Sequence, residues 1–378
     1  MKKILLSAYI VTWVLLLSAC GGGSKTSSLQ AEGDTIRMKY SSLLQIVKHA
    51  DYTVVTIRNP WDTLKVLHTY LLADREKPLP EHLPEGTVVR TPLQKSVIYS
   101  SVHCSLWSEL DELKGIGGVC GLEYIKLPQI QEGCRNGSIV NVGNSMNPDI
   151  ERIIDLRPDA ILLSPFENSG GYGRVGKLNI PIIECADYME TSPLGRAEWM
   201  RFFGLLYGCE HKTDSLFAQV EKEYSDIKSK TSSLSERPSV FSELKIGSTW
   251  YVAGGNSTTS RFFADAGARY VFSQLPQSGS VALSAEAVLD KAQDADFWLI
   301  KYNQDKDKTY TELKKEDVLY AQFEAFKNRQ IYGCNTHYIR FYEESPFHPE
   351  YLLKDFVKIF HPELLPDYQS RYFHSLNE

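Results

Sequence analysis

The chain has 378 residues, of which 43% are hydrophobic and 23% are charged, and its formal net charge at neutral pH is −6. This length is sufficient to bury the cores of two domains. The acidic balance, without a long basic run, argues against nucleic acid as a partner. No stretch beyond the first twenty residues is apolar and long enough to cross a bilayer. We therefore expect a soluble protein of two domains after the N-terminal segment.

Residues 1–20 are typical of a secretory signal peptide. Two lysines precede a largely apolar run from Ile4 to Leu17, which is too short for a resident membrane helix. The sequence Leu-Ser-Ala-Cys ending at Cys20 resembles a bacterial lipobox, and this resemblance implies that Cys20 is lipidated. The alternative is a plain signal peptide with a chance cysteine. The glycine-rich and polar residues 21–35 predict a flexible tether, so we expect a protein of the periplasm or cell envelope, anchored to a membrane.

Six further cysteines follow, and none of them forms a Cys-x-x-Cys pair, so the spacing of zinc and thioredoxin sites is missing. They are Cys104, Cys120, Cys134, Cys185, Cys209 and Cys334. An exported protein can form disulfides. In a chain of this size we favour buried free thiols, with one bridge left open.

Strand and helix signals alternate in the first half of the chain. Apolar and β-branched residues predict a strand of an N-terminal β extension at 52–58, and Asn-Pro-Asp at 147–149 precedes a short amphipathic helix at 150–156. The expected elements of this half are strands at 96–100, 116–119, 160–163 and 178–184, and helices at 102–113 and 150–156.

The second half repeats this order. The expected elements are strands at 239–242, 249–252, 297–300 and after 326, and helices at 257–266 and 285–290. Glu151 and Asp155 in the first half match Glu286 and Asp290 in the second. A helix and strand pattern of this kind is typical of an open α/β sheet. We therefore predict two similar α/β lobes, residues 36–208 with the β extension and residues 237–378.

A long helix is predicted to link the two lobes. Ser192-Pro193 is a favourable helix start, and that helix should end at Gly208. A second helix is expected from Thr213 to Ser229, within a linking segment of residues 209–236. A helix between two lobes resists bending, so we expect little domain closure.

At this point two sets of motifs carry a resemblance to a known family. In the first lobe they are Val142-Gly143, residues 147–153 and residues 156–160; in the second they are residues 237–240, 253–257, 266–268 and 283–286. Together they resemble the helical-backbone class of periplasmic solute-binding proteins of ABC importers, over roughly residues 88–378. These importers carry ferric siderophores, haem and vitamin B12.

The resemblance implies a ligand cleft between the lobes, on the side opposite the linking helix. It implies no catalytic residues, no resident metal or cofactor, and an ABC permease with its ATPase as partners. It also implies an acid on each lobe that pairs with arginines of the permease. The matching positions are Glu151 and Asn256, the latter standing where an acid is usual. For Glu151 the alternative is a solvated residue that the helix dipole favours in a first turn.

Candidate ligand contacts lie in the loops beyond the carboxyl ends of the expected strands, where ligands bind in open α/β sheets. Aromatic walls suit large flat ligands, and Arg or Lys suits anionic chelates. Trp250, Tyr251 and Arg340 are the foremost candidates, and core packing is the alternative for each aromatic. His337 could ligate iron together with Tyr338, but a lone His is more often structural. The full set is Tyr124, Phe166, Arg174, Trp250, Tyr251, Lys301, Tyr338 and Arg340.

Two further motifs are interpreted without chemistry. Residues 171–176 fit the dinucleotide pattern G-x-G-x-x-G, but the next strand follows too soon for the helix that must hold a pyrophosphate. We expect a loop at the rim of the cleft instead. His348-Pro349-Glu350 and His361-Pro362-Glu363 look like a metal pair, and we interpret them as two helix starts with proline near the first position.

These observations predict a monomeric lipoprotein that captures a small metal chelate for an ABC importer. We expect a ferric siderophore first, cobalamin second and haem third. An exported α/β hydrolase is a rival, but neither Gly-x-Ser-x-Gly nor His-Glu-x-x-His occurs in the sequence. A second rival is a surface interaction module, or a lipoprotein that passes metal complexes to another receptor.

Overall fold

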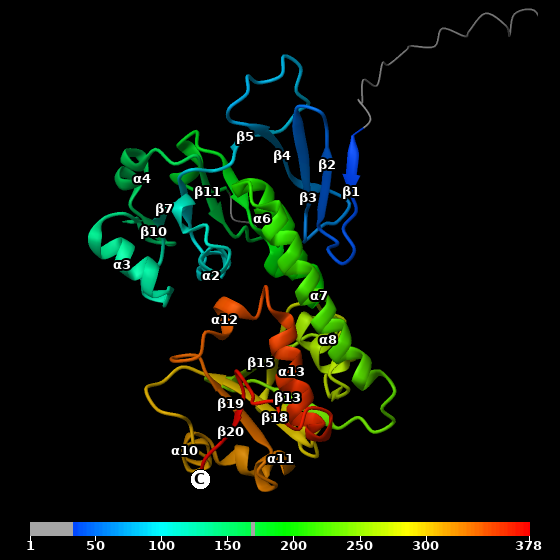
Figure 1. The fold of residues 1–378 in the computed structure, drawn as a ribbon. Helices are drawn as coiled ribbons and strands as arrows, with labels where there is room; N and C mark the ends of the chain where they lie inside the picture. The colour runs from blue at the N-terminus through cyan, green and yellow to red at the C-terminus, as the bar shows by residue number, and fades with distance from the viewer. Residues whose placement is uncertain (1–32, 168–170) are drawn as a thin grey trace, which may run out of the picture. The chain divides into compact units, whose positions relative to one another are not determined.

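The computed structural model describes residues 33–167 and 171–378 (Figure 1). The predicted signal peptide, Cys20 and residues 21–32 of the predicted tether lie outside these residues. The end of the predicted tether is a strand, β1 (Asp34–Ile36), which pairs antiparallel with β2 (Leu44–Lys48). The tether therefore ends before Asp34, which corrects the boundary at residue 35.

The N-terminal β extension is a five-stranded sheet in the order β1-β2-β3-β4-β5, in which only β4 and β5 are parallel. Its remaining strands are β3 (Tyr52–Arg58), β4 (Val66–Asp74) and β5 (Thr87–Thr91). The strand predicted at 52–58 is confirmed. In β2 and β3 Ile46, Val55 and Ile57 are fully buried, so one face of the sheet closes on a core.

The first lobe contains a parallel sheet in the order β12-β11-β6-β7-β8. Its three central strands, β11, β6 and β7, are fully buried, which suits a parallel sheet covered on both faces. They are β6 (Ser96–Ile98), β7 (Ile116–Val119), β8 (Val140–Asn141), β11 (Ala160–Leu163) and β12 (Ile182–Glu184). The helices are α2 (Ser101–Glu109), α3 (Pro128–Asn136) and α4 (Ile150–Leu156), and a hairpin of β9 (Gly143–Asn144) and β10 (Asn147–Pro148) precedes α4.

Three helices lead from the first lobe to the second: α5 (Pro193–Glu198), α6 (Met200–Tyr207) and α7 (Glu210–Ser232). The single helix predicted from Ser192 to Tyr207 is divided at Trp199, a fully buried residue whose indole donates to Glu190. Gly208 ends α6 at a φ of 66°, as the sequence predicted. The linking helix α7 has 23 residues, which makes it about 35 Å long, and it packs against α6 and α13 (Pro349–Phe360).

The second lobe contains a sheet in the order β16-β13-β18-β19-β20, parallel except for its last strand. Its strands are β13 (Ser239–Ser242), β16 (Arg269–Tyr270), β18 (Phe297–Tyr302), β19 (Ile331–Asn335) and β20 (His374–Ser375). The other helices of this lobe are α8 (Thr258–Asp265), α9 (Ala285–Ala292), α10 (Tyr310–Glu316), α11 (Glu324–Lys327) and α12 (Phe341–Glu344). The fold class is thus confirmed, with two similar α/β lobes and a long linking helix.

Short 3₁₀ helices complete the connections in both lobes. They are η1 (Leu113–Gly115), η2 (Leu122–Tyr124), η3 (Val175–Lys177), η4 (Ala186–Met189), η5 (Val318–Gln322) and η6 (Pro362–Leu364). None of the helices in the described residues is long and apolar enough to span a membrane.

The strand predicted at 249–252 has a different partner from the one that the repeat suggested. It is β15 (Thr249–Ala253), which pairs antiparallel with β14 (Lys245–Ile246) and β17 (Ser280–Ser284) in a separate sheet. The parallel neighbour of β13 is the short β16. The second lobe therefore carries an antiparallel insertion, and β15 is not the counterpart of β7.

Candidate functional site

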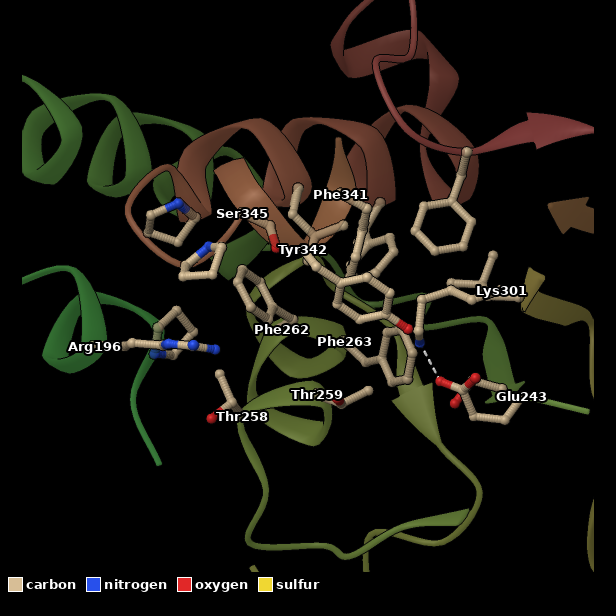
Figure 2. A pocket seen from close by; sticks show the side chains of 18 of the residues that line it. Arg196, Glu243, Thr258, Thr259, Phe262, Phe263, Lys301, Phe341, Tyr342 and Ser345 are labelled. Atoms are coloured by element: carbon tan, nitrogen blue, oxygen red, sulfur yellow. Dashed lines mark hydrogen bonds and ion pairs between the residues drawn. The ribbon is translucent and has the colours of Figure 1, made fainter. Parts of the chain in front are cut away.

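A cavity of about 310 Å³ lies between the two lobes (Figure 2). We call it the interlobe cavity. Its walls come from α2 and α5 of the first lobe and from β13, β18, α8, α12 and α13 of the second. The residues that the argument uses are Val102, Pro193, Arg196, Glu243, Phe262, Phe263, Lys301, Phe341, Tyr342 and Phe356.

The order of the strands explains the position of this cavity. The chain leaves β13 for β16 on one side and returns to β18 on the other, so the strand order reverses between β13 and β18. Ligands of open α/β sheets bind at such a reversal, outside the carboxyl ends of the strands. Glu243 directly follows β13 and Lys301 is near the end of β18, and both line the cavity.

One end of the interlobe cavity carries a charge pair. The ammonium of Lys301 donates to the carboxylate of Glu243, and the two side chains are 20% and 28% exposed. Burial by itself would lower the pKa of Lys301, but the charge and hydrogen bond of Glu243 outweigh it and raise that pKa. Lys301 thus stays protonated, and the pair as a whole is neutral.

The middle of the cavity is aromatic. Phe262 and Phe263 come from α8, which begins where the Ser257 hydroxyl accepts from the backbone N–H of Ser260 at 3.1 Å. Phe341 and Tyr342 come from α12, and the rings of Phe263 and Phe356 lie 5.1 Å apart. Figure 2 shows Phe262, Phe263 and Tyr342 between the Arg196 end and the Lys301 end. Such walls suit flat or apolar groups.

The end of the cavity opposite to Lys301 is formed by Arg196 on α5. Its Nε donates to Asp187 Oδ2 at 3.1 Å, and Asp187 also contacts Nε2 of His103 at 3.2 Å. His103 and Asp187 are 2% and 3% exposed, whereas Arg196 is 26% exposed. Burial would raise the pKa of Asp187, but the contacts with His103 and Arg196 outweigh it and lower the pKa. The Asp187 carboxylate is therefore ionised and holds the guanidinium in place.

A second cavity, of about 550 Å³, lies on the first lobe. Tyr99 follows β6 and Ser164 follows β11, and both line it, so this first-lobe cavity lies at the strand reversal of the first sheet. It contains two of the predicted ligand contacts, Phe166 and Arg174. The segment 171–176 lines it as a loop that continues into η3 rather than a long helix, so the dinucleotide interpretation was rightly set aside.

Trp250, the foremost predicted contact, is a core residue. It is fully buried, its Nε1 donates to the carbonyl of Ser242, and its ring packs 5.8 Å from those of Trp298 and Phe323. It lines neither cavity, because β15 belongs to the antiparallel insertion and not to the parallel sheet. We therefore correct the expectation that Trp250 contacts the ligand. It packs in the core, which was the alternative given for each aromatic residue. Tyr251 points to the other side of β15 and is 46% exposed.

The other predicted contacts are divided among several places. Lys301 lines the interlobe cavity, as described. Arg340 pairs with Glu344 at 2.6 Å in a separate polar hollow. The Tyr338 hydroxyl donates to the carbonyl of Asp305, and Tyr124 is 74% exposed in η2. Thus Arg340, Tyr338 and Tyr124 do not meet Lys301 in one cavity.

A profile of the family described as periplasmic binding protein matches residues 101–338. The chain belongs to this family. The match covers more than half of the chain and begins at α2, so the N-terminal β extension lies outside it. The resemblance inferred from the motifs of the two lobes is thereby confirmed. The chain is therefore a periplasmic binding protein.

Relatives and solved structures agree with this family. An uncharacterized lipoprotein of Methanocaldococcus jannaschii is 26% identical over 325 residues, which cover 82% of this chain and 76% of that protein. A possible iron-binding periplasmic solute-binding protein of Staphylococcus epidermidis superposes with a TM-score of 0.56 at 16% identity, covering 71% of this chain and 99% of the other. The haem-binding protein HutB of Vibrio cholerae gives a TM-score of 0.56 at 16% identity over 72% and 99%. The structural likenesses establish the fold, and the family with its lipoprotein relatives indicates an extracytoplasmic location.

In this binding protein Glu151 and Glu286 occupy equivalent positions, one on each lobe. Each is the second residue of a helix, α4 or α9, and each is exposed. The preceding residues cap these helices, Asp149 accepting from Arg152 N at 3.1 Å and Ser284 from Ala287 N at 3.2 Å. Helix α4 leads to β11, which pairs with β6, the first strand of the parallel sheet in the first lobe. Helix α9 leads to β18, which pairs with β13, the first strand of the corresponding sheet in the second lobe.

Asn256 has a different setting. It precedes α8, and its side-chain amide donates to the carbonyl of Pro276 at 2.8 Å. In the second lobe, therefore, the structural equivalent of Glu151 is Glu286 and not Asn256. Permease docking at Asn256 stays a prediction from the motif.

The lobes of the binding protein are joined by a buried histidine. Nε2 of His348 lies 2.7 Å from Glu109 of α2, and its Nδ1 lies 2.8 Å from Glu350 of α13. Burial would lower the pKa of His348, but the two carboxylates outweigh it and raise the pKa to about 9. His348 and His361 precede Pro349 and Pro362 at the first positions of α13 and η6, which confirms the interpretation as helix starts.

The described residues contain no cluster of three His, Cys, Asp or Glu side chains that could hold a metal ion. Cys104, Cys120, Cys185, Cys209 and Cys334 are buried and Cys134 is partly buried, and all six are free thiols. The sequence favoured this arrangement over a bridge.

Apart from Lys301, none of the side chains that line the interlobe cavity was predicted from the sequence as a ligand contact, among them Arg196, Phe262 and Tyr342. Phe262 lies in a helix whose apolar residues are equally typical of core packing. Arg196 follows a helix start, but no local signal shows that it faces the other lobe. Tyr342 lies two residues after Arg340, one of the predicted contacts, so the sequence pointed to its neighbourhood but not to this side chain.

Proposed function

We propose that this binding protein captures an iron complex of the siderophore type in the interlobe cavity and delivers it to an ABC permease. The observation that carries the proposal is the interlobe cavity itself, at the carboxyl ends of β13 and β18 and closed from the first lobe by Val102, Pro193 and Arg196. Aromatic walls with a charged group at each end can hold a chelate by its rings and its polar atoms.

The size of the cavity favours a compact chelate over the alternatives, cobalamin and haem. Its 310 Å³ lies at the lower end of the range of about 300–1,000 Å³ typical of small-molecule sites. A corrin or porphyrin would require the lobes to separate. The linking helix α7 packs against elements of both lobes and opposes such a movement.

The docking surface that we propose consists of Glu151 and Glu286. Both are exposed acids in a first helical turn, where the helix dipole favours the ionised form. The Glu286 carboxylate also accepts hydrogen bonds from its own backbone N–H and from Ser284, which lower its pKa. Two acids on equivalent helices can pair with arginines of a permease, whose ATPase then drives import.

We further propose that Cys20 carries the lipid that holds the protein at the membrane. The lipobox-like sequence before Cys20 supports this, as does the description of two relatives as lipoproteins. A Cys20→Ser variant should be recovered without lipid and released from membranes, as measured by fractionation and intact mass. Recovery of an equally lipidated variant would remove Cys20 from this role.

The decisive experiment is a titration of the full-length protein, purified in detergent, followed by tryptophan fluorescence and native mass. The probes are ferric citrate, the ferric complexes of 2,3-dihydroxybenzoate and acetohydroxamate, haem and cobalamin. We expect saturable one-to-one binding of a ferric complex. Tyr342→Ala should weaken it by about 10–100-fold, whereas Tyr251→Ala, outside the cavity, should not. Silence from every probe, or equal effects of the two variants, would contradict the proposal.

A further inference from the structure

We propose that the solute of the interlobe cavity is an anionic chelate and that Arg196 is the side chain that selects it by charge. This inference rests on the proposed function, because it names the class of solute for the same cavity. It concerns one end of that cavity, formed by Arg196, Asp187 and His103.

The guanidinium of Arg196 has unused hydrogen-bonding capacity. Arg carries five N–H donors in a planar fork that matches a carboxylate or a similar anion. Only Nε is engaged, with Asp187, and the two terminal nitrogens contact no acceptor among residues 33–167 and 171–378. Figure 2 shows the guanidinium extending from α5 toward Phe262 and the interior of the cavity. The free edge of the fork therefore faces the solute.

The support behind Arg196 fixes both its position and its polarity. Asp187 is almost fully buried and is held from its other oxygen by His103, which is equally buried. The negative member of the pair thus lies inside the first lobe and the positive member lies at the cavity wall. A pair oriented in this way attracts an anion and repels a cation, although its net charge is zero.

The remaining cavity wall does not oppose an anion. Glu243 is the one carboxylate among the lining residues, and Lys301 neutralises it at the end away from Arg196. Between the two ends the lining is aromatic, with the hydroxyls of Thr259 and Ser345 as further polar groups. Flat rings next to an anion-binding fork are suited to an iron complex with aromatic, anionic donors, such as a catecholate. A neutral hydroxamate complex would leave the Arg196 fork without a partner.

The test compares two ferric complexes of similar size and different charge. The anionic complex is that of 2,3-dihydroxybenzoate, and the neutral one is that of acetohydroxamate. We expect the full-length protein to bind the anionic complex at least about 10-fold more tightly. Arg196→Gln should lower the affinity for the anionic complex by about 10–100-fold and leave that for the neutral complex nearly unchanged. Arg196→Lys should fall between, because it keeps the charge without the fork.

A matched control is Arg201→Gln. Arg201 lies one turn and a half further along, on α6, and pairs with Asp214 at 2.9 Å outside the cavity. It should bind both complexes as the wild type does. A merely structural role of Arg196 would weaken both complexes alike, so the readout is the ratio of the two affinities. If Arg196→Gln does not fold, as judged by circular dichroism, the ratio in Arg196→Lys carries the test.

Three results would overturn the inference. Equal affinity of the wild type for the two complexes would remove charge as the basis of selection. An unchanged ratio in the Arg196 variants would remove this residue as its origin, while binding of either complex leaves the proposed function intact. Binding of no ferric complex would overturn the proposed function and the inference together.

Discussion

The two lobes share the order of four parallel strands, β12-β11-β6-β7 in the first and β19-β18-β13-β16 in the second, but they reach it by different means. In the first lobe the parallel neighbour of β6 is β7, a fully buried strand, and only the small hairpin β9–β10 precedes α4. In the second lobe the equivalent neighbour of β13 is the two-residue β16, and the three-stranded sheet β14-β15-β17 precedes α9. The segment that resembles a parallel strand there belongs to the insertion.

The antiparallel insertion packs beside the parallel sheet of the second lobe and does not cover the strand ends that line the interlobe cavity. The rings of Trp250, Phe241 and Trp298 form one core between the insertion and the parallel sheet. The ends of β13 and β18 remain free to line the interlobe cavity. An aromatic residue at a strand end can therefore be core or site, and the sheet to which the strand belongs decides which.

The largest effect on stability that we expect is that of Trp250→Ala, which tests whether this aromatic residue belongs to the core or to the site. Removing a fully buried indole should lower the free energy of unfolding by about 3–5 kcal/mol and leave solute affinity unchanged. Tyr251→Ala, on the exposed side of the same strand, should change it by less than about 0.5 kcal/mol. Urea unfolding measures both. Loss of affinity in Trp250→Ala at unchanged stability would return Trp250 to the site.

The next effect concerns the contact between the lobes at His348. Its pKa in the folded protein, about 9, lies above the value of about 6.5 for an unfolded chain. Protonation thus stabilises the folded state fully below pH 6.5, and this contribution is lost as the pH rises through 9.

His348→Gln should accordingly lower the free energy of unfolding by roughly 1–3 kcal/mol more at pH 6 than at pH 9.5. Equilibrium unfolding over this pH range checks the expectation. His337→Gln, at a half-buried histidine outside the contact between the lobes, provides the control. Parallel pH profiles for wild type and His348→Gln would show that the contacts with Glu109 and Glu350 do not act through protonation.

The smallest effect on stability, and a large one on transport, is expected from the acids of the two lobes. Glu151→Lys and Glu286→Lys should each change the free energy of unfolding by less than about 0.5 kcal/mol and keep solute affinity. Each should reduce uptake by the assembled importer to a small fraction. Asn256→Lys introduces the same charge at the opposite end of the β15–β17 pair from Glu286 and should leave uptake normal. Impaired uptake in Asn256→Lys alone would favour the docking position first inferred from the motif.

The sequence predicted those features that depend on local signals. The bounds of α4 and β11 follow from a capping aspartate, a short apolar repeat and a proline stop, and the structure reproduces them at 150–156 and 160–163. The partner of β15 was not predictable in the same way, because alternation identifies a strand but not its neighbour. Arg196 was missed because its place in the cavity depends on Asp187 and on a lobe whose first strand begins more than forty residues further along the chain.

The buried thiols have a consequence for how the molecule can be studied. Burial raises the pKa of Cys120 and Cys209 to about 11 and that of Cys334 to about 12, so these groups stay protonated and unreactive while the fold is closed. Cys120 lies in the first lobe and Cys334 in the second. The rates at which each is alkylated would report the opening of its own lobe. The native chain thus contains reporters that can reveal whether its two halves unfold together or in turn.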